Sequence, residues 1–168
     1  MTLSMYQASA PRFVNTLKNL SAILDKAQAH CEARKVDPLV LTASRLYPDM
    51  LALARQVQIA CDNAKGAVAR LAGVEAPKHE DSEQTLAELK ARIAKTIAFI
   101  ETLTPAQIDG SEDRDIALKL GPREVQWKGM QYLLGFALPN FYFHVVTAYD
   151  ILRHNGVELA KRDYIGNP

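Results

Sequence analysis

The feature that most constrains the fold is an apolar stripe with helical spacing, which recurs in four stretches of the chain. In the first stretch, apolar residues follow one another at steps of four and three: Phe13, Leu17, Leu20, Leu24, Ala27 and Cys31. Residues three and four positions apart lie on one face of an α-helix. The pattern therefore predicts a helix over about residues 3–34 with one face turned to a core. Asp37-Pro38 should end it, since a proline disfavours the helical conformation in the residue before it.

Three further stretches carry the same spacing and predict helices over about residues 48–72, 82–103 and 130–155. Ser82 is of a residue type that favours the N-cap of the third helix. Pro139 lies inside the fourth pattern, where a proline removes a backbone donor, so a kink or a fresh start is expected there. Four such helices in one short chain predict a four-helix bundle.

Between the third and fourth stretches the apolar spacing changes from helical to alternating. Apolar residues alternate with polar or small ones on both sides of Gly121-Pro122: Ile116, Leu118, Leu120, Val125 and Trp127. Alternation on both sides of a turn predicts a short β-hairpin over about residues 115–128. The fold class predicted is all-α, a single domain over residues 1–168 with this hairpin inserted before the last helix. The residues after 156 are expected to be irregular and to pack on the bundle.

Composition narrows the range of functions. Of the 168 residues, 48% are hydrophobic and 23% are charged, which is enough apolar material for a packed core. Lys and Arg total 20 against 19 for Asp and Glu, so the net charge of +1 gives no electrostatic drive toward nucleic acid or a membrane surface. We therefore expect neither as a partner. Phosphate-binding glycine loops and nucleophile motifs are also missing from the sequence.

The two cysteines and the first residues bear on the compartment. Cys31 and Cys61 lie 30 positions apart, without the spacing of a zinc ribbon or redox motif, and each falls in a helical apolar pattern. We expect two buried thiols. The first ten residues lack a basic stretch followed by an apolar one, so no secretory signal is expected. A reducing, cytoplasmic location fits both observations.

Two blocks of sequence resemble a known family. One is LPNFYFH at residues 138–144, followed by AYDILRHNGV at residues 148–157; the other is SEQTLAELKARI at residues 82–93, followed by FIETLTP at residues 99–105. Together they resemble the DinB/YfiT-like four-helix-bundle superfamily, in a branch that carries a domain-of-unknown-function label. The resemblance implies a bundle, often dimeric, around a metal site of three histidines. One of these is on the second helix and two, spaced HxxxH, are on the last. Some members use the metal to activate a thiol cofactor or a related nucleophile in transfer and isomerisation reactions, and others have no known activity.

The metal triad of the superfamily is incomplete here. His144 matches the first histidine of the last helix, but four residues later the chain has Ala148. His154 cannot replace it, because ten residues of helix span about 15 Å, far beyond the reach of one metal ion. The second predicted helix contains no histidine, and its polar candidates for an inward position are Gln56, Gln58, Asp62 and Asn63.

Three interpretations of His144 stay open from the sequence. It is a buried histidine hydrogen-bonded to a neighbouring helix, a remnant contact for a metal or small ligand helped by Asp62, or a general base, for which a pKa near 6.5 is suitable. The aromatic residues of the last helix pack in the core and a dimer interface, or else line a ligand pocket. The ligand-pocket candidates are His144, Tyr142, Tyr149, Gln58 and Asp62, and the metal-ligand candidate is His144.

The sequence thus predicts an uncharacterised DinB-like bundle with a degraded metal triad, acting as a small-molecule-binding or assembly module without a cofactor. The alternative is a transferase or isomerase with a pocket near His144, either metal-free or using zinc or nickel. A homodimer is expected from the resemblance and from the apolar excess of the last helix. The sequence leaves open whether the chain is an enzyme and what ligand it binds.

Overall fold

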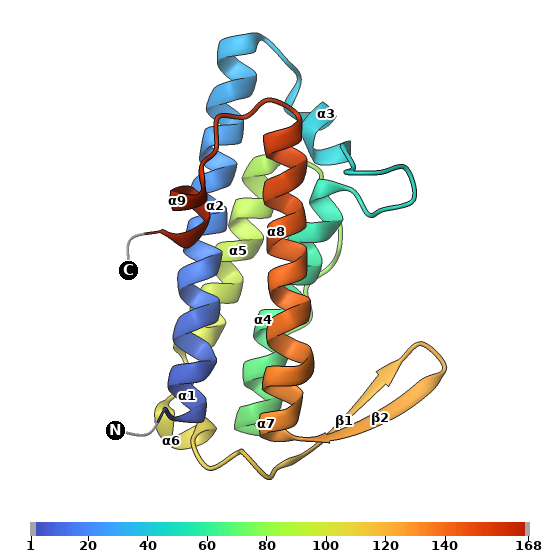
Figure 1. Cartoon of the computed structure of the whole chain (residues 1–168). Coiled ribbons are helices and arrows are strands. Elements are labelled where there is room, and N and C mark those ends of the chain that lie inside the picture. Colours follow the sequence, from blue (N-terminus) through green and yellow to red (C-terminus); the bar gives the residue numbers. More distant parts are fainter. Residues whose placement is uncertain (1–2, 167–168) are drawn as a thin grey trace.

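The computed structural model of the chain describes residues 3–166, and within them four long helices run along one axis (Figure 1). These are α2 (Ala10–Arg34), α4 (Leu53–Ala72), α5 (Leu86–Glu101) and α8 (Leu138–His154). Helix α4 packs against both α5 and α8, and α2 packs against α5. The all-α four-helix bundle with a hairpin before the last helix is confirmed. Most residues of the predicted apolar stripes form its core, although Leu134 of the fourth stripe is exposed. The first stripe is completely buried: Phe13, Leu17, Leu20, Leu24, Ala27 and Cys31.

The first predicted helix is broken once. A short helix, α1 (Met5–Ala8), precedes α2, and Ser9 separates them with a non-helical backbone. The Ser9 hydroxyl donates a hydrogen bond to the Met5 carbonyl at 2.6 Å, which competes with the regular helical ladder. The continuous helix predicted over residues 3–34 is therefore wrong at its first turns.

The second predicted helix begins later than the sequence suggested. Helix α4 starts at Leu53, and residues 48–52 belong to an irregular loop. The Leu53 amide donates to the Ser44 carbonyl at 2.9 Å, so backbone bonding closes this loop before the helix starts. A short helix, α3 (Pro38–Ala43), lies before the loop, and the Asp37 carboxylate caps it by accepting from the Leu39 amide at 2.9 Å.

The third predicted helix also starts later, because the cap is Thr85 and not Ser82. The Thr85 hydroxyl accepts from the Glu88 amide at 3.2 Å, and the Glu88 carboxylate accepts from the Thr85 amide at 2.9 Å. This reciprocal capping box satisfies two backbone donors at once. A further short helix, α6 (Pro105–Ile108), follows α5.

The predicted hairpin is present with the expected bounds. Strands β1 (Asp115–Leu120) and β2 (Arg123–Lys128) pair antiparallel, and Ile116 lies opposite Trp127. The hairpin projects sideways from one end of the bundle (Figure 1). The Trp127 ring stacks on Phe136 with 5.3 Å between ring centroids, and this contact attaches the hairpin to the segment leading into α8.

The last helix widens before Pro139. A helical turn, α7 (Gly129–Tyr132), passes through a π-helical turn, η1 (Leu133–Ala137), into α8. The Leu138 amide donates to the Leu133 carbonyl, five residues back, so the wider turn ends just ahead of the proline. Pro139 is the second residue of α8, and because it has no N–H it makes no backbone hydrogen bond back into the wider turn. The change of helix predicted at Pro139 is thus found in the preceding turn.

After α8 the chain turns at Gly156, whose φ of 89° suits glycine, and returns along α2. The tail contains a short helix, α9 (Lys161–Ile165), where irregular chain was predicted. It is attached to α2, because Lys26 pairs with Asp163 at 2.7 Å and the Asn19 amide donates to the Tyr164 carbonyl at 3.0 Å. In the part of the chain that the structure describes, no helix is long and apolar enough to cross a membrane.

Candidate functional site

His144 lies on the side of α8 that packs against α4, and its side chain is 8% exposed. Its Nδ1 atom is 2.7 Å from Oε1 of Gln56 on α4. The same Gln56 side chain donates through Nε2 to the Leu51 carbonyl at 3.0 Å. Of the three interpretations of His144, the structure therefore shows the hydrogen bond to a neighbouring helix.

This chain of hydrogen bonds determines which nitrogen of the imidazole ring carries the proton. The Leu51 carbonyl can only accept, so Gln56 must turn its amide nitrogen toward it and its oxygen toward His144. Nδ1 of His144 consequently carries the proton and donates it to Gln56. In this tautomer Nε2 keeps its lone pair. Burial lowers the pKa of His144 below its ordinary value of 6.5, and the nearby Arg55 cation lowers it further. The ring is thus neutral at pH 7.

A second polar pair joins the same two helices. The Asn140 side chain on α8 donates to the Asn63 side chain on α4 at 2.9 Å. Asn63 lies two turns along α4 from Gln56, and Asn140 lies one turn along α8 from His144. The two pairs fix the register between α4 and α8, since each satisfies polar groups that the helix packing partly removes from water.

The structure gives His144 no obvious metal-binding companions. Within residues 3–166, there is no group of three His, Cys, Asp or Glu side chains that could hold a metal ion. The groups beside His144 are the Gln56 amide and the Phe143 ring, whose centroid lies 5.3 Å from that of His144. A neutral amide is a poor ligand for zinc or nickel.

The two tyrosines predicted as pocket residues lie elsewhere. Tyr142 packs edge-on against Phe141 and lines a surface depression together with residues of α2 such as Arg12. Tyr149 packs edge-on against Tyr164 of α9, with 6.3 Å between the ring centroids. Both tyrosines thus contribute to packing on the α2 side of α8, whereas His144 contacts α4.

Asp62 belongs to a different cluster, centred on Arg92 of α5, and Gln58 lies beside that cluster. The Arg92 guanidinium is 2% exposed and pairs with Asp62 at 2.8 Å, Asp81 at 2.9 Å and Glu83 at 3.1 Å. It also donates to the Glu80 carbonyl at 2.9 Å. We call these five residues, Arg92, Asp62, Glu80, Asp81 and Glu83, the Arg92 cluster. The cluster fastens the connection between α4 and α5 to both helices.

Further polar side chains complete the surroundings of the Arg92 cluster. Gln58 donates to Glu83 at 3.0 Å, and Lys65 pairs with Asp62 at 2.7 Å. Arg55 pairs with Asp81, and the two arginines together hold the pKa of that carboxyl below its ordinary value. Burial lowers the pKa of His79, and the cations Lys65 and Arg92 lower it further. Each carboxylate that pairs with Arg92 thus lies next to at least one cation, which is typical of a structural ion network.

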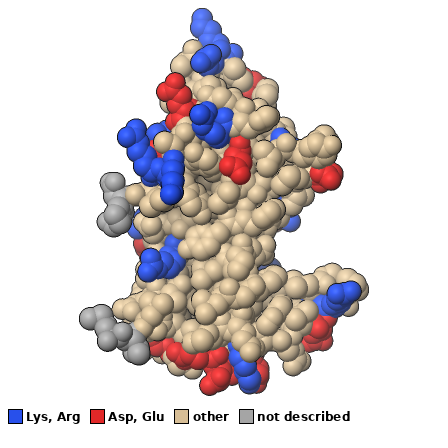
Figure 2. All heavy atoms as spheres, viewed as in Figure 1, with Lys and Arg blue, Asp and Glu red and all other residues tan. Residues whose placement is uncertain are grey.

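One surface feature was only partly anticipated from the sequence. Residues 130–149 contain no Lys, Arg, Asp or Glu, yet several of their side chains are exposed. We define the outer α8 face as the exposed residues Leu134, Gly135, Pro139, Phe143 and Val146. Figure 2 shows tan atoms, which belong to residues other than Lys, Arg, Asp and Glu, across the middle of the surface over α8, with most charged side chains toward the two ends of the molecule. The apolar excess was visible in the sequence, but its exposure required the structure.

Comparisons with known proteins fit this architecture. Residues 5–165 match the sequence model of a family described as a domain of unknown function, DUF1993. A crystal structure of a DinB family member from Shewanella denitrificans is similar, with a TM-score of 0.88 and 46% sequence identity over 97% of this chain and 92% of that chain. No curated protein matches the chain. The match over nearly the whole chain, together with the shared bundle, shows that the protein belongs to the DUF1993 family and has a DinB-like fold.

Proposed function

We propose that this chain is an assembly module that forms a homodimer through the outer α8 face. The observation that carries the proposal is the uncharged stretch of residues 130–149, part of which is exposed to solvent. Leu134 is 55% exposed, Phe143 56% and Val146 38%. Single exposed apolar residues are ordinary on a protein surface, but a contiguous uncharged face is typical of an interaction site.

Comparison with another helix of the same bundle strengthens this argument. The exposed positions of α2 include Arg12, Lys18 and Asp25, as expected of a helix face that stays in water. The exposed positions of the outer α8 face, in contrast, hold only apolar residues and one glycine. Depletion of charge and enrichment in aromatic residues are the compositional signature of interface centres. Phe143 is the largest exposed side chain of this face and should contribute most to binding.

A second copy of the chain is the partner that this face suits best. A two-fold axis places the same surface of each copy against the other, so a charge close to the axis would meet the like charge of the other copy. A face without charges avoids that repulsion. Pro139, Phe143 and Val146 follow one another at steps of four and three, and Gly135 lies one further turn before them. The small Gly135 allows the partner helix to come close.

Sedimentation velocity at several protein concentrations tests the proposal. We expect a dimer for the wild type, and a dissociation constant raised by more than roughly tenfold for Phe143→Lys and Val146→Lys, because each buries a charge in an apolar contact. The matched control is Val40→Lys, since Val40 of α3 is 57% exposed and lies outside the face. A monomeric wild type at all concentrations would contradict the proposal, as would equal effects of the three substitutions.

A second candidate function is an enzyme with a site at His144. The neutral ring with its lone pair on Nε2 supports it, because this form can bind a divalent metal such as zinc or nickel, or accept a proton. The test is the metal content of untagged protein grown with both metals, measured by plasma mass spectrometry. About one ion per chain, lost in His144→Ala, would favour a metal enzyme, since catalytic metals bind stoichiometrically. A metal content below roughly a tenth of an ion per chain would exclude a metal enzyme.

A further inference from the structure

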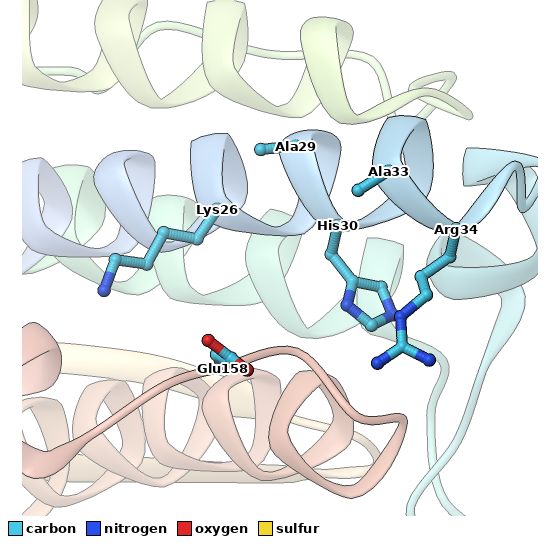
Figure 3. A pocket seen from close by; sticks show the side chains of 6 residues that line it. All are labelled: Lys26, Ala29, His30, Ala33, Arg34 and Glu158. Carbon is cyan, nitrogen blue, oxygen red and sulfur yellow. The ribbon is translucent and has the colours of Figure 1, made fainter.

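A pocket of about 420 Å³ lies between α2 and the segment that follows α8 (Figure 3). Its size falls within the range of small-molecule sites. It is independent of both the outer α8 face and His144. The pocket is lined by Lys26, Ala29, His30, Ala33, Arg34 and Glu158.

The α2 wall of the pocket presents nitrogen-bearing side chains from successive turns. Lys26, His30 and Arg34 are spaced by four residues and therefore share one helix face. All three extend from α2 toward the segment that carries Glu158 (Figure 3). The residues between them on this wall, Ala29 and Ala33, have only methyl side chains, which leaves room between the longer ones.

The opposite wall carries one carboxylate on a backbone segment that is anchored on both sides. Glu158 lies between Val157 and Leu159, which are both buried in the core. The Val157 amide also donates to the Leu152 carbonyl at 3.1 Å, which ties this segment to the end of α8. The Leu159 amide donates back to the Val157 carbonyl at 2.9 Å, so Glu158 is the central residue of a three-residue turn and is exposed on the pocket side, while its two neighbours are buried.

The charges across the pocket are not paired with each other. Lys26 is engaged by Asp163 at 2.7 Å, at the edge of the pocket. Among residues 3–166, however, neither Arg34 nor Glu158 has an oppositely charged partner within 4.0 Å. One cation, Arg34, and one anion, Glu158, thus face a common space from opposite walls without bridging it.

We infer that this pocket binds a small zwitterion with one carboxylate and one ammonium group, of the size of an amino acid. The planar Arg34 guanidinium suits a carboxylate through two parallel hydrogen bonds, and His30 offers a further donor beside it. Glu158 accepts hydrogen bonds from the ammonium group. A simple anion would pair with Arg34 but would be repelled by Glu158. A simple cation would pair with Glu158 but would be repelled by Arg34.

The first part of the test is a titration of the full-length, ¹⁵N-labelled protein by NMR with glycine, L-alanine and L-leucine. Acetate and methylammonium serve as the two halves of the ligand. We expect saturable shifts of the Ala29, Ala33 and Glu158 amides with at least one amino acid, at a dissociation constant of about 1 mM or lower. Each half-ligand should bind at least roughly tenfold more weakly, because it satisfies one wall only. Absence of saturable shifts with all three amino acids would overturn the inference.

Substitutions then separate the two walls. Arg34→Gln and Glu158→Gln should each weaken amino-acid binding by roughly tenfold or more, whereas the controls Arg12→Gln and Glu75→Gln, exposed and outside the pocket, should leave it unchanged. Glu158→Gln should not weaken the binding of acetate. If acetate binds as tightly as the amino acids and Glu158→Gln strengthens both, the site binds plain anions and the zwitterion assignment is wrong.

Discussion

Replacing Arg92 by leucine tests how the connection between α4 and α5 is held. The guanidinium is almost fully buried and pairs with three carboxylates, those of Asp62, Asp81 and Glu83. Removing one member of a buried ion pair costs about 3–5 kcal/mol, because the other charge is left without its partner. Water and other cations offset part of this loss, since the Asp62 and Asp81 side chains are 39% and 38% exposed. We therefore expect a loss of stability at the lower limit of this range, about 3 kcal/mol.

For Arg92→Leu we expect the free energy of unfolding to fall by about 3 kcal/mol and the melting temperature by roughly 6–12 °C, given 2–4 °C per kcal/mol for a chain of this length. Urea denaturation and calorimetry at pH 7 measure both quantities. Amide hydrogen exchange should also increase in residues 80–85, which Arg92 fastens to the helices. Arg92→Lys should give an intermediate loss, because an ammonium keeps the charge but not the forked geometry.

The matched control is Lys18→Leu. Lys18 pairs with Glu101 across two helices, but the two side chains are 59% and 53% exposed. Exposed pairs contribute little, so this change should cost below about 0.5 kcal/mol. The reasoning is refuted if Arg92→Leu costs no more than Lys18→Leu, or if hydrogen exchange in the connection stays unchanged.

Three further predictions follow from the fold. Thr85→Ala should cost about 1 kcal/mol in urea denaturation and Ser82→Ala close to nothing, because Thr85 is the cap that the structure shows; equal losses would contradict this. Stability should fall as pH drops below 6.5, because the unfolded chain protonates His144 before the folded chain does, and His144→Asn should reduce that slope in pH-dependent unfolding; an unchanged slope would argue against it. Burial raises the pKa of Cys61 to about 12, so a thiol reagent should leave it unmodified in the native protein and react after unfolding; rapid native labelling would refute the prediction.

The helices were predictable because each depends on a local pattern. An apolar residue at every third or fourth position can be read without knowing the partner helix, and most residues of the four stripes form the core as expected. Leu134, predicted as part of the fourth stripe, is the clear exception, because it is 55% exposed. The starting points were harder to predict. Ser82 and Thr85 are both suitable caps by residue type, but only Thr85 has a glutamate three residues later to complete the capping box. That signal was present in the sequence and would have given the correct start.

The side-chain clusters depended on contacts that the sequence does not encode locally. Arg92 meets Asp62 from 30 residues away, and its role as a buried centre follows from the packing of α5 on α4. The partnership of His144 with Gln56 spans 88 residues. Sequence reasoning named Asp62, Gln56 and His144 as candidates, but it did not name Arg92 and could not pair any of them. The pocket residue Glu158 lies in a tail whose course along α2 had no pattern from which to predict it.

The mass of the wild-type protein in solution tests the central claim most directly. Light scattering coupled to size exclusion, at a low and a high loading concentration, requires no substitution and no ligand. The account predicts a mass at twice the chain mass of 18.6 kDa, since the uncharged outer α8 face should be covered by a second copy. A mass of a single chain at both concentrations would contradict it.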